Sequence, residues 1–284
     1  MNSMTDKLFI GIQYVLPARL LGACTYRLAR SRSIWLKNLL IRSFTRLFSI
    51  DESEMDKDRA TDYPSFNAFF TRALKPGARP IDANPLSVCS PADGRIQQAG
   101  QVSYGRMIQA KGMTFSAGEL LNAEPADVEP FDGGAFMTIY LAPHNYHRVH
   151  APLAGQLRRM HFIPGSRFSV NRVTADSIPG LFARNERVAC LFDGPHGPYW
   201  LVFVGAMNVS SISTAWAGET PGGREPTKTV FDVESGPVFN KGDYIGHFNL
   251  GSTVIIIFPR DTVSWDQSLQ PQDELTVGRS IGTL

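Results

Sequence analysis

The sequence Gly-His-Phe-Asn-Leu-Gly-Ser-Thr-Val-Ile-Ile-Ile-Phe, residues 246–258, ends in an apolar run rich in β-branched residues. Such a run is typical of a buried strand, and we expect Thr253–Phe258 to be a core strand. Gly251 and Ser252 precede it. Glycine leaves its carbonyl open to attack and tolerates backbone angles that other residues resist, while the strand would hold the serine rigidly. The stretch therefore suits a serine that attacks its own backbone; the alternative is a plain turn entering a strand.

Short β-rich runs separated by Gly/Pro turns fill the chain from residue 87 onward. They are Arg95–Val102, Gly134–Leu141, Leu157–Ile163, Arg187–Phe192, Tyr199–Val204, Val209–Ala215 and Thr253–Phe258. Helical periodicity is scarce in this part, with Ala117–Leu121 as a candidate. The pattern predicts an α+β fold in which N-terminal amphipathic helices precede a mainly antiparallel β-sandwich or barrel-like body.

The first fifty residues are strongly basic, although the whole chain has a formal net charge of only +2. They contain one acidic residue, Asp6, and eight basic ones: Lys7, Arg19, Arg27, Arg30, Arg32, Lys37, Arg42 and Arg46. Leu, Ile, Phe and Trp residues are interleaved with these charges. This combination favours an anionic lipid surface over nucleic acid as the partner.

A basic amphipathic helix is predicted from Ser33 onward, with Trp35 near its start. Its apolar residues recur at helical spacing, and its arginines Arg42 and Arg46 fall on another face; the apolar residues are Leu36, Leu40, Phe44 and Leu47. The helix is expected to contact a membrane interface, the alternative being that it packs on the core. The apolar stretch 8–18 is too short to span a bilayer.

An acidic stretch, residues 51–62, ends this leader. We therefore predict two parts: a basic, apolar, helical membrane-associating segment with its linker (1–62) and a β-rich catalytic domain (63–284). A short helix should open the second part, with Ser65 as its N-cap. Cys24, Cys89 and Cys190 are far apart and match no metal-binding spacing, which indicates free thiols in a reducing compartment. No secretory signal is evident at the start.

Two further groups of residues carry chemistry. Tyr-His-Arg-Val-His, residues 146–150, places His147 and His150 at a turn that leads into a strand, and Asp93 opens a strand at an Asp-Gly turn. Ser252, His150 and Asp93 can form a Ser/His/Asp set, in which the histidine accepts the serine proton and the carboxylate stabilises the charged imidazole.

Each of these residues also has an ordinary structural explanation. An aspartate at such a turn often caps its own backbone, and a histidine is often a core or surface residue without chemistry. A metal site from His144, His147 and His150 lacks a nearby carboxylate or cysteine ligand, so none is predicted. The Gly-x-Ser-x-Gly elbow of α/β-hydrolases is absent around Ser252.

These features together resemble the bacterial phosphatidylserine decarboxylase family, whose members are made as proenzymes. The likeness rests on Leu-Gly-Ser-Thr (250–253), Tyr-His-Arg-Val-His (146–150), Pro-Ala-Asp-Gly (91–94) and Phe-Asn-Ala-Phe-Phe (66–70). Ile-Pro-Gly (163–165) and Phe-Ser-Val-Asn (168–171) add to it. Family members often have aspartate where this chain has Asn145.

The resemblance implies that His150, oriented by Asp93, deprotonates Ser252, which attacks the Gly251 carbonyl. Residue 252 would become a covalent pyruvoyl group that forms a Schiff base with the substrate amine. Fragments 1–251 and 252–284 would stay associated. His147 is the implied proton donor when phosphatidylserine loses carbon dioxide and becomes phosphatidylethanolamine. No separate cofactor or metal is implied.

The implied location is peripheral, on the cytoplasmic face of the inner membrane, and the resemblance leaves room for a homo-oligomer. Arg148 and Arg167 are candidates for contact with the lipid phosphate, the alternative being that both are merely solvated. Two other functions stay open from the residues alone: a non-enzymatic, membrane-peripheral β-domain and a serine lipid hydrolase. The first predicts an uncut chain, and the second predicts release of fatty acid.

Overall fold

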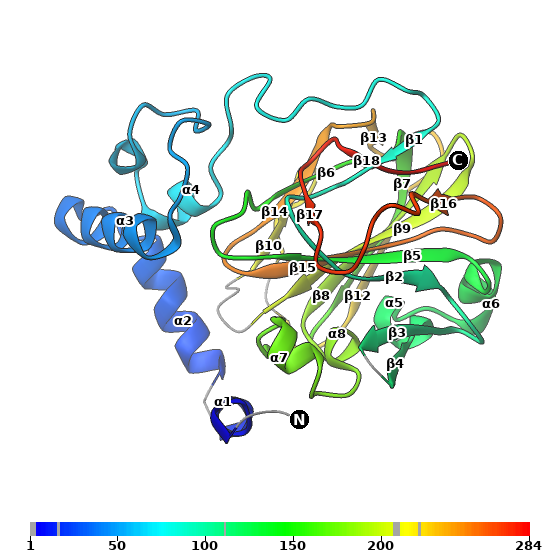
Figure 1. The fold of residues 1–284 in the computed structure, drawn as a ribbon, viewed down its shortest axis with the longest axis horizontal. Helices are drawn as coiled ribbons and strands as arrows, with labels where there is room; N and C mark the ends of the chain where they lie inside the picture. Colours follow the sequence, from blue (N-terminus) through cyan, green and yellow to red (C-terminus); the bar gives the residue numbers. More distant parts are fainter. Residues whose placement is uncertain (1–3, 16–17, 111, 207–210, 221–222) are drawn as a thin grey trace.

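The structure is a computed structural model that describes all residues except 1–3, 16–17, 111, 207–210 and 221–222. Its N-terminal helices lie along one side of a β-rich body (Figure 1). The helices are α1 (Met4–Val15), α2 (Ala18–Ala29), α3 (Ile34–Phe48), α4 (Phe66–Phe70), α5 (Ala117–Leu121), α6 (Pro125–Val128), α7 (Arg172–Ala175) and α8 (Leu181–Arg184), with short 3₁₀ turns η1 (Ala60–Asp62) and η2 (Glu129–Phe131).

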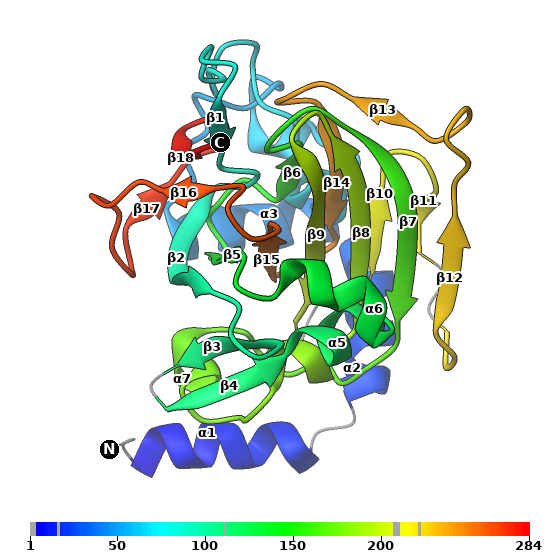
Figure 2. The same ribbon diagram turned by 90° about the vertical axis from the view of Figure 1, so that its right-hand side faces the viewer.

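The largest sheet forms the centre of the body, and all its pairings are antiparallel. Figure 2 shows β7, β8 and β9 running side by side in this sheet. In spatial order its strands are β12 (Thr227–Val230), β7 (Gly155–Ile163), β8 (Arg187–Gly194), β9 (Gly197–Gly205), β15 (Ser252–Ile257), β5 (Ala135–Leu141), β2 (Gly94–Gln101) and β17 (Glu274–Leu275), with β13 (Val238–Phe239) also paired to β7.

Three smaller antiparallel sheets complete the body. They are β11 (Gly218–Glu219), β10 (Ile212–Thr214), β14 (Tyr244–Phe248) and β6 (Arg148–His150); then β1 (Ser87–Cys89), β18 (Ser280–Thr283) and β16 (Ser264–Trp265); and the hairpin of β3 (Arg106–Ala110) and β4 (Met113–Ser116). The predicted α+β class is confirmed, and the described strands form no closed barrel. Of the predicted strand Val209–Ala215, residues 209–210 lie outside the described residues.

The central strand is β15, as its sequence predicts. Every residue of β15 is buried and pairs with β5 on one side and β9 on the other. A strand covered on both faces and both edges has no place for polar alternation, which explains the continuous Val-Ile-Ile-Ile run. The rigid frame expected behind Ser252 is therefore present.

The predicted short helix with Ser65 as its N-cap is also confirmed, as helix α4. The Ser65 hydroxyl accepts a hydrogen bond from the Ala68 backbone N–H at 3.1 Å, which caps helix α4. Phe66, Phe69 and Phe70 of this helix are buried. They pack with Ile41 of α3 in a second hydrophobic cluster, separate from the core of the large sheet.

Helix α3 uses one face to pack on the body and leaves another exposed. Leu40 and Phe44 pack against the second cluster, so this part of the predicted apolar face contacts protein. Leu47, predicted on the same face, is 74% exposed, and Trp35 is also 74% exposed. Within the described residues no single helix is long and apolar enough to span a bilayer; α1 and α2 satisfy the length and composition criteria only as a pair bent by 92°.

Candidate active site

Ser252 and Asp93 lie at the same end of two strands in the large sheet. Strand β15 begins there with Ser252, which pairs with Leu141 at the end of β5 and with Gly205 at the end of β9. Strand β2 begins on the far side of β5, directly after Asp93. Neighbouring strands are about 4.8 Å apart, so the backbones at Ser252 and Asp93 are roughly 10 Å apart. Topology thus brings together residues that are far apart in sequence.

Ser252 has an unusual environment for a hydroxyl. Its side chain is fully buried, and its Oγ has no hydrogen-bond partner among the described residues. A buried polar group without a partner costs about 1–3 kcal/mol, so native structures rarely keep one without a reason. Chemistry at that oxygen is such a reason.

The backbone before Ser252 is strained. Leu250 has φ 91° and Gly251 has φ 62°, both in the region that favours glycine. Leu250 is held there by burial, because its side chain packs in the second cluster with residues of α3 and α4. Strain of this kind persists only where the surrounding structure enforces it, and it is commonly found at functional sites.

Asp93 is buried, and its charge is neutralised by Arg79. The Arg79 Nη2 lies 2.6 Å from the Asp93 Oδ2, and the Nε lies 3.0 Å from both carboxylate oxygens. The Val277 backbone N–H also donates to Asp93 at 2.8 Å. Arg79 donates in addition to both oxygens of Glu54, at 2.9 Å. Asp93 is therefore a fixed carboxylate with an arginine and a backbone amide as its partners.

His150 lies beside the Asp93 turn, since its backbone N–H donates to the Pro91 carbonyl at 2.8 Å. Its Nδ1 is 2.8 Å from the Gly242 carbonyl oxygen, which can only accept, so the proton is assigned to Nδ1. Its Nε2 then accepts from the Tyr146 hydroxyl at 3.1 Å. Burial lowers the pKa of His150, while the Asp93 charge acts in the opposite direction.

The structure therefore places Asp93 two strand spacings from Ser252 in the large sheet, and His150, in β6 of the four-stranded sheet, beside the Asp93 turn. Among the described residues, Asp93 has Arg79 and Val277 as partners, and His150 has Gly242 and Tyr146. The predicted relay through these three side chains stays a prediction. In the described arrangement His150 presents an unprotonated Nε2, which is the form that a general base requires.

His147 is completely buried against the ring of Phe70, with ring centroids 4.0 Å apart. Its Nδ1 is 2.7 Å from the Asn145 carbonyl oxygen, and its Nε2 has no partner among the described residues. Burial lowers the pKa of His147 to about 3, and the Arg72 guanidinium acts in the same direction. His147 is thus neutral at physiological pH, with a free lone pair on Nε2.

Two arginines near these groups were not predicted from the sequence. Arg79 has no sequence signal, since the carboxylates that it binds become neighbours only in the fold. Arg72 follows the aromatic helix α4 after one intervening residue, Thr71, and is buried. Its Nη2 is 3.4 Å from the His144 carbonyl oxygen, whereas its Nε and Nη1 have no partner within the described part of the chain. The sequence signal for Arg72 is a charged residue shortly after a helix rich in aromatic residues.

A polar network holds the segment that leads to the strained turn. The Asn249 Oδ1 accepts from Asn67 of α4 at 2.9 Å, and the Asn249 Nδ2 donates to the hydroxyls of Ser211 and Ser213 at 3.0 Å. This network ties the turn to helix α4 on one side and to β10 on the other. Within the described residues, no group of His, Cys, Asp and Glu side chains could hold a metal ion.

Comparison with known proteins identifies the family. The family model described as phosphatidylserine decarboxylase matches residues 66–283, and a second model, described as PSD, matches residues 8–49. The chain belongs to the phosphatidylserine decarboxylase family. The phosphatidylserine decarboxylase proenzyme of Azotobacter vinelandii is 49% identical over 282 residues, which is 98% of this chain and 99% of that protein. The proenzyme of Marinobacter nauticus is 47% identical over 283 residues, 99% of both chains.

Phosphatidylserine decarboxylase proenzymes carry a pyruvoyl group made from one of their serines. The surroundings of Ser252 fit such a group. The site is buried, its hydroxyl is committed to no hydrogen bond among the described residues, and the strained turn lies immediately before it. The family assignment therefore agrees with the chemistry that the residues indicate.

Proposed function

We propose that Ser252 is the serine that becomes the pyruvoyl group, and that the chain is cleaved between Gly251 and Ser252. As a member of its family, the protein converts phosphatidylserine to phosphatidylethanolamine and carbon dioxide. The observation that carries the assignment is the buried Ser252 hydroxyl without a described partner, directly after two residues with positive φ. Cleavage at this bond divides the chain into fragments 1–251 and 252–284.

The cleavage and the formation of the pyruvoyl group need only groups of this chain and one water molecule. The Ser252 oxygen adds to the Gly251 carbonyl carbon as its proton passes to a base, and the bond from that carbon to the Ser252 nitrogen then breaks, leaving an ester. Elimination expels the Gly251 carboxylate and leaves a dehydroalanine at position 252. Water then replaces its nitrogen, which leaves as ammonia. We assign the base to His150, whose Nε2 is unprotonated and whose charged form is favoured by Asp93.

The fragments are expected to stay together after cleavage because 252–284 is woven into the body. Strand β15 lies between β5 and β9, β17 pairs with β2, and β18 pairs with β1. All of β15 is buried. Separating the fragments would expose this strand and two sheet edges.

In the decarboxylation, the pyruvoyl group supplies an electron sink for the carbon that loses carbon dioxide. We propose that His147 donates the proton that must return to this carbon. His147 is neutral in the free protein because burial and Arg72 lower its pKa. An anionic substrate that enters beside it would raise that pKa, since a nearby negative charge favours the imidazolium. Substrate binding would thus favour uptake of a proton from solvent by His147, which then donates it to the carbon.

We infer a peripheral location on the cytoplasmic face of the inner membrane, with residues 1–62 as the associating segment. Helices α1–α3 combine exposed apolar side chains with basic ones; Leu8, Val15 and Trp35 are all more than half exposed. A helix of this composition binds anionic lipid surfaces by apolar burial and charge together. The three free cysteines are compatible with a reducing compartment.

The activity can be tested with phosphatidylserine labelled in its carboxyl group. The purified protein should release labelled carbon dioxide and form phosphatidylethanolamine, and Ser252→Ala should do neither. His147→Gln is expected to mature to two fragments but to decarboxylate at least a hundredfold more slowly, since positioned acid–base groups contribute about that much. Release of fatty acid would instead support a lipid hydrolase.

A further inference from the structure

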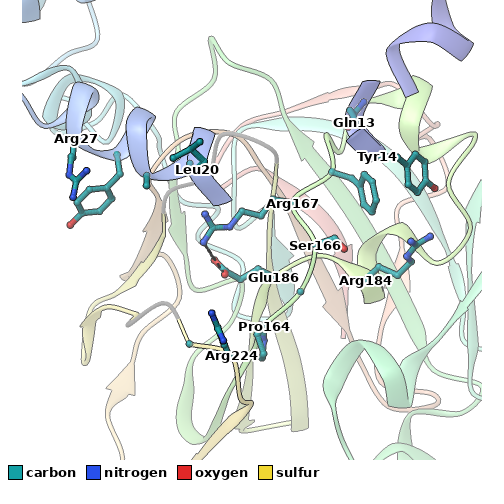
Figure 3. Close-up of a pocket in the computed structure, with 16 residues that line it drawn as sticks. Gln13, Tyr14, Leu20, Arg27, Pro164, Ser166, Arg167, Arg184, Glu186 and Arg224 are labelled. Atoms are coloured by element: carbon teal, nitrogen blue, oxygen red, sulfur yellow. Dashed lines mark hydrogen bonds and ion pairs between the residues drawn. The ribbon is translucent and has the colours of Figure 1, made fainter. Parts of the chain in front are cut away.

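A large cleft lies between the N-terminal helices and the body. Its volume is about 1360 Å³, which exceeds the 300–1,000 Å³ typical of small-molecule sites. One wall comes from α1 and α2, and the other from the loop 164–168, α8 and the segment around Arg224 (Figure 3). The Gln13 Oε1 accepts from the Ser169 N–H at 2.8 Å and so fixes α1 at one end.

The described lining of the cleft is strongly basic. It contains four arginines, Arg27, Arg167, Arg184 and Arg224, and one carboxylate, Glu186. Arg167 pairs with Glu186 at 3.1 Å, as Figure 3 shows. The other three arginines form no ion pair with any carboxylate in the described part of the chain. Unpaired guanidinium groups around one cavity favour an anionic ligand, above all a phosphate.

The same cleft also offers apolar surface. Tyr14 and Leu20 contribute from the helices and Phe168 from the body, with the rings of Tyr14 and Phe168 5.0 Å apart. Leu20 is 63% exposed, and the apolar surface continues outward along α1 to Leu8 and Ile12. A free inorganic phosphate makes no contact with such a surface. A phosphate carrying hydrocarbon chains matches both the charge and the apolar wall.

The floor of the cleft lies close to Ser252. The Glu186 carbonyl accepts from the Gly205 N–H at 2.9 Å. Gly205 of β9 in turn pairs with Ser252 of the neighbouring strand β15. Two strand spacings separate the backbones at Glu186 and Ser252, roughly 10 Å. The reach of an arginine side chain bridges most of this distance. A phosphate held in the cleft would place a head group only a few bonds long near the start of β15.

From these observations we propose that the cleft binds the phosphodiester and the upper acyl chains of a glycerophospholipid, with Arg224 on the phosphate. Arg184 lies at the other end of the cleft, over the Phe168 ring (Figure 3). The proposal rests on the proposed function, since it assigns the substrate's lipid part to a place beside Ser252. It also gives the leader a second role, because α1 and α2 form one wall of the cleft. Arg167, in contrast, is held by Glu186 and shapes the floor.

Binding can be measured on the uncleaved Ser252→Ala protein by calorimetry, with dihexanoyl phosphatidic acid as a probe that carries phosphate and short chains. Adding Arg224→Gln should weaken this binding at least tenfold, because a charge-assisted contact with the phosphate is lost. Arg172→Gln is the matched control: this arginine is 73% exposed, lies outside the cleft and should leave affinity unchanged. Unchanged affinity after Arg224→Gln would overturn the proposal.

A steric variant and a chain-free probe complete the test. In Gly22→Leu the added side chain meets the Arg167 guanidinium, because even a Cβ there would lie 2.7 Å from its Nη1, so the same loss of binding is expected. Glycerol 3-phosphate should bind at least tenfold more weakly than the lipid. Equal affinity for the two probes would mark a simple phosphate site and overturn the assignment to lipid.

Kinetics on the matured protein separate this proposal from the proposed function. With dihexanoyl phosphatidylserine, Arg224→Gln should raise KM at least tenfold and leave kcat within about twofold, since the reacting groups are untouched. Carbon dioxide release with an unchanged KM would refute the cleft and leave the decarboxylase standing. Lipid binding without any carbon dioxide release would refute the proposed function and leave the cleft standing.

Discussion

The Arg79 guanidinium contacts both carboxylate oxygens of Asp93, with 2.6 Å as the shortest distance, at a place where both side chains are largely buried. This pair fixes the Asp93 carboxylate at the turn that His150 adjoins. Removing one partner of a buried pair leaves an uncompensated charge, which costs about 3–5 kcal/mol. The pair is therefore a structural condition for the catalytic role assigned to Asp93.

Arg79→Ala should lower the free energy of unfolding by that amount and slow maturation. Urea unfolding of the uncleaved Ser252→Ala chain, with and without Arg79→Ala, measures the first effect. Arg95→Ala is the matched control, since its ion pair with Glu274 is exposed on both sides and should contribute under about 1 kcal/mol. Equal decreases in the free energy of unfolding for the two variants would show that the Arg79–Asp93 pair stabilises the protein no more than an exposed ion pair does.

The buried His147 should make stability depend on pH. Its pKa is about 3 in the folded protein and near 6.5 when unfolded, so the unfolded chain binds more protons between these values. Stability is then full above pH 6.5 and falls as the pH drops, by up to about 1.4 kcal/mol per pH unit from this residue.

Urea unfolding of the uncleaved chain at several pH values between 4 and 7 checks this. His147→Gln should remove the contribution of His147 to the pH dependence of the free energy of unfolding. The contribution of His247 should stay, because burial also lowers the pKa of His247, to about 4. An identical pH slope with and without His147 would mean that the imidazole is solvated in the folded protein.

Gly251→Ala tests the strained turn. A Cβ at this position would meet only Ala206, at 3.7 Å, so space is available, but φ 62° is costly for alanine by about 1–2 kcal/mol. Relaxation to negative φ would move the Gly251 carbonyl away from the Ser252 oxygen. We expect fragment 252–284 to form about tenfold more slowly, which denaturing gels over time can follow.

Gly11→Ala is the control for this substitution, because its Cβ would meet nothing within 4 Å and its backbone is helical. It should mature at the normal rate. An unchanged rate in Gly251→Ala would show that the turn conformation is irrelevant to cleavage.

The exposed face of α3 should contribute to membrane binding. Trp35 is 74% exposed and Leu39, one turn later, is 48% exposed. Burial of each in a lipid interface is worth up to about 1.5–3 kcal/mol, so Trp35→Ala/Leu39→Ala should reduce partitioning into phosphatidylglycerol vesicles at least tenfold. The control Tyr104→Ala/Val238→Ala removes two exposed side chains from the body and should leave this partitioning unchanged. Equal binding of both double variants in sedimentation assays would remove α3 from the interface.

The local patterns predicted more of this molecule than the distant contacts did. The β-branched run predicted a core strand at 253–258, and Ser65 predicted the helix cap, because both follow from neighbours in sequence. The Gly242 carbonyl on His150 and the Arg79 guanidinium on Asp93 come from segments 92 and 14 residues away. The fold determines which of these distant groups come into contact, and no periodicity in the sequence indicates it.

The packing of Leu250 illustrates the same limit. No pattern in the sequence indicates what covers this side chain, which packs in the cluster that includes residues of α3 and α4. The leader that was predicted to serve the membrane therefore also holds the turn before Ser252. A sequence pattern shows which face of a helix is apolar, whereas the fold determines whether protein or lipid covers it.

Intact mass spectrometry of the purified chain and of Ser252→Ala tests the central claim most directly. We expect two masses for the unmodified sequence, corresponding to 1–251 and to 252–284 with a blocked, pyruvoyl-bearing first residue, and a single full-length mass for Ser252→Ala. Two fragments from Ser252→Ala, or a cut at any bond other than Gly251–Ser252 in the unmodified chain, would contradict it.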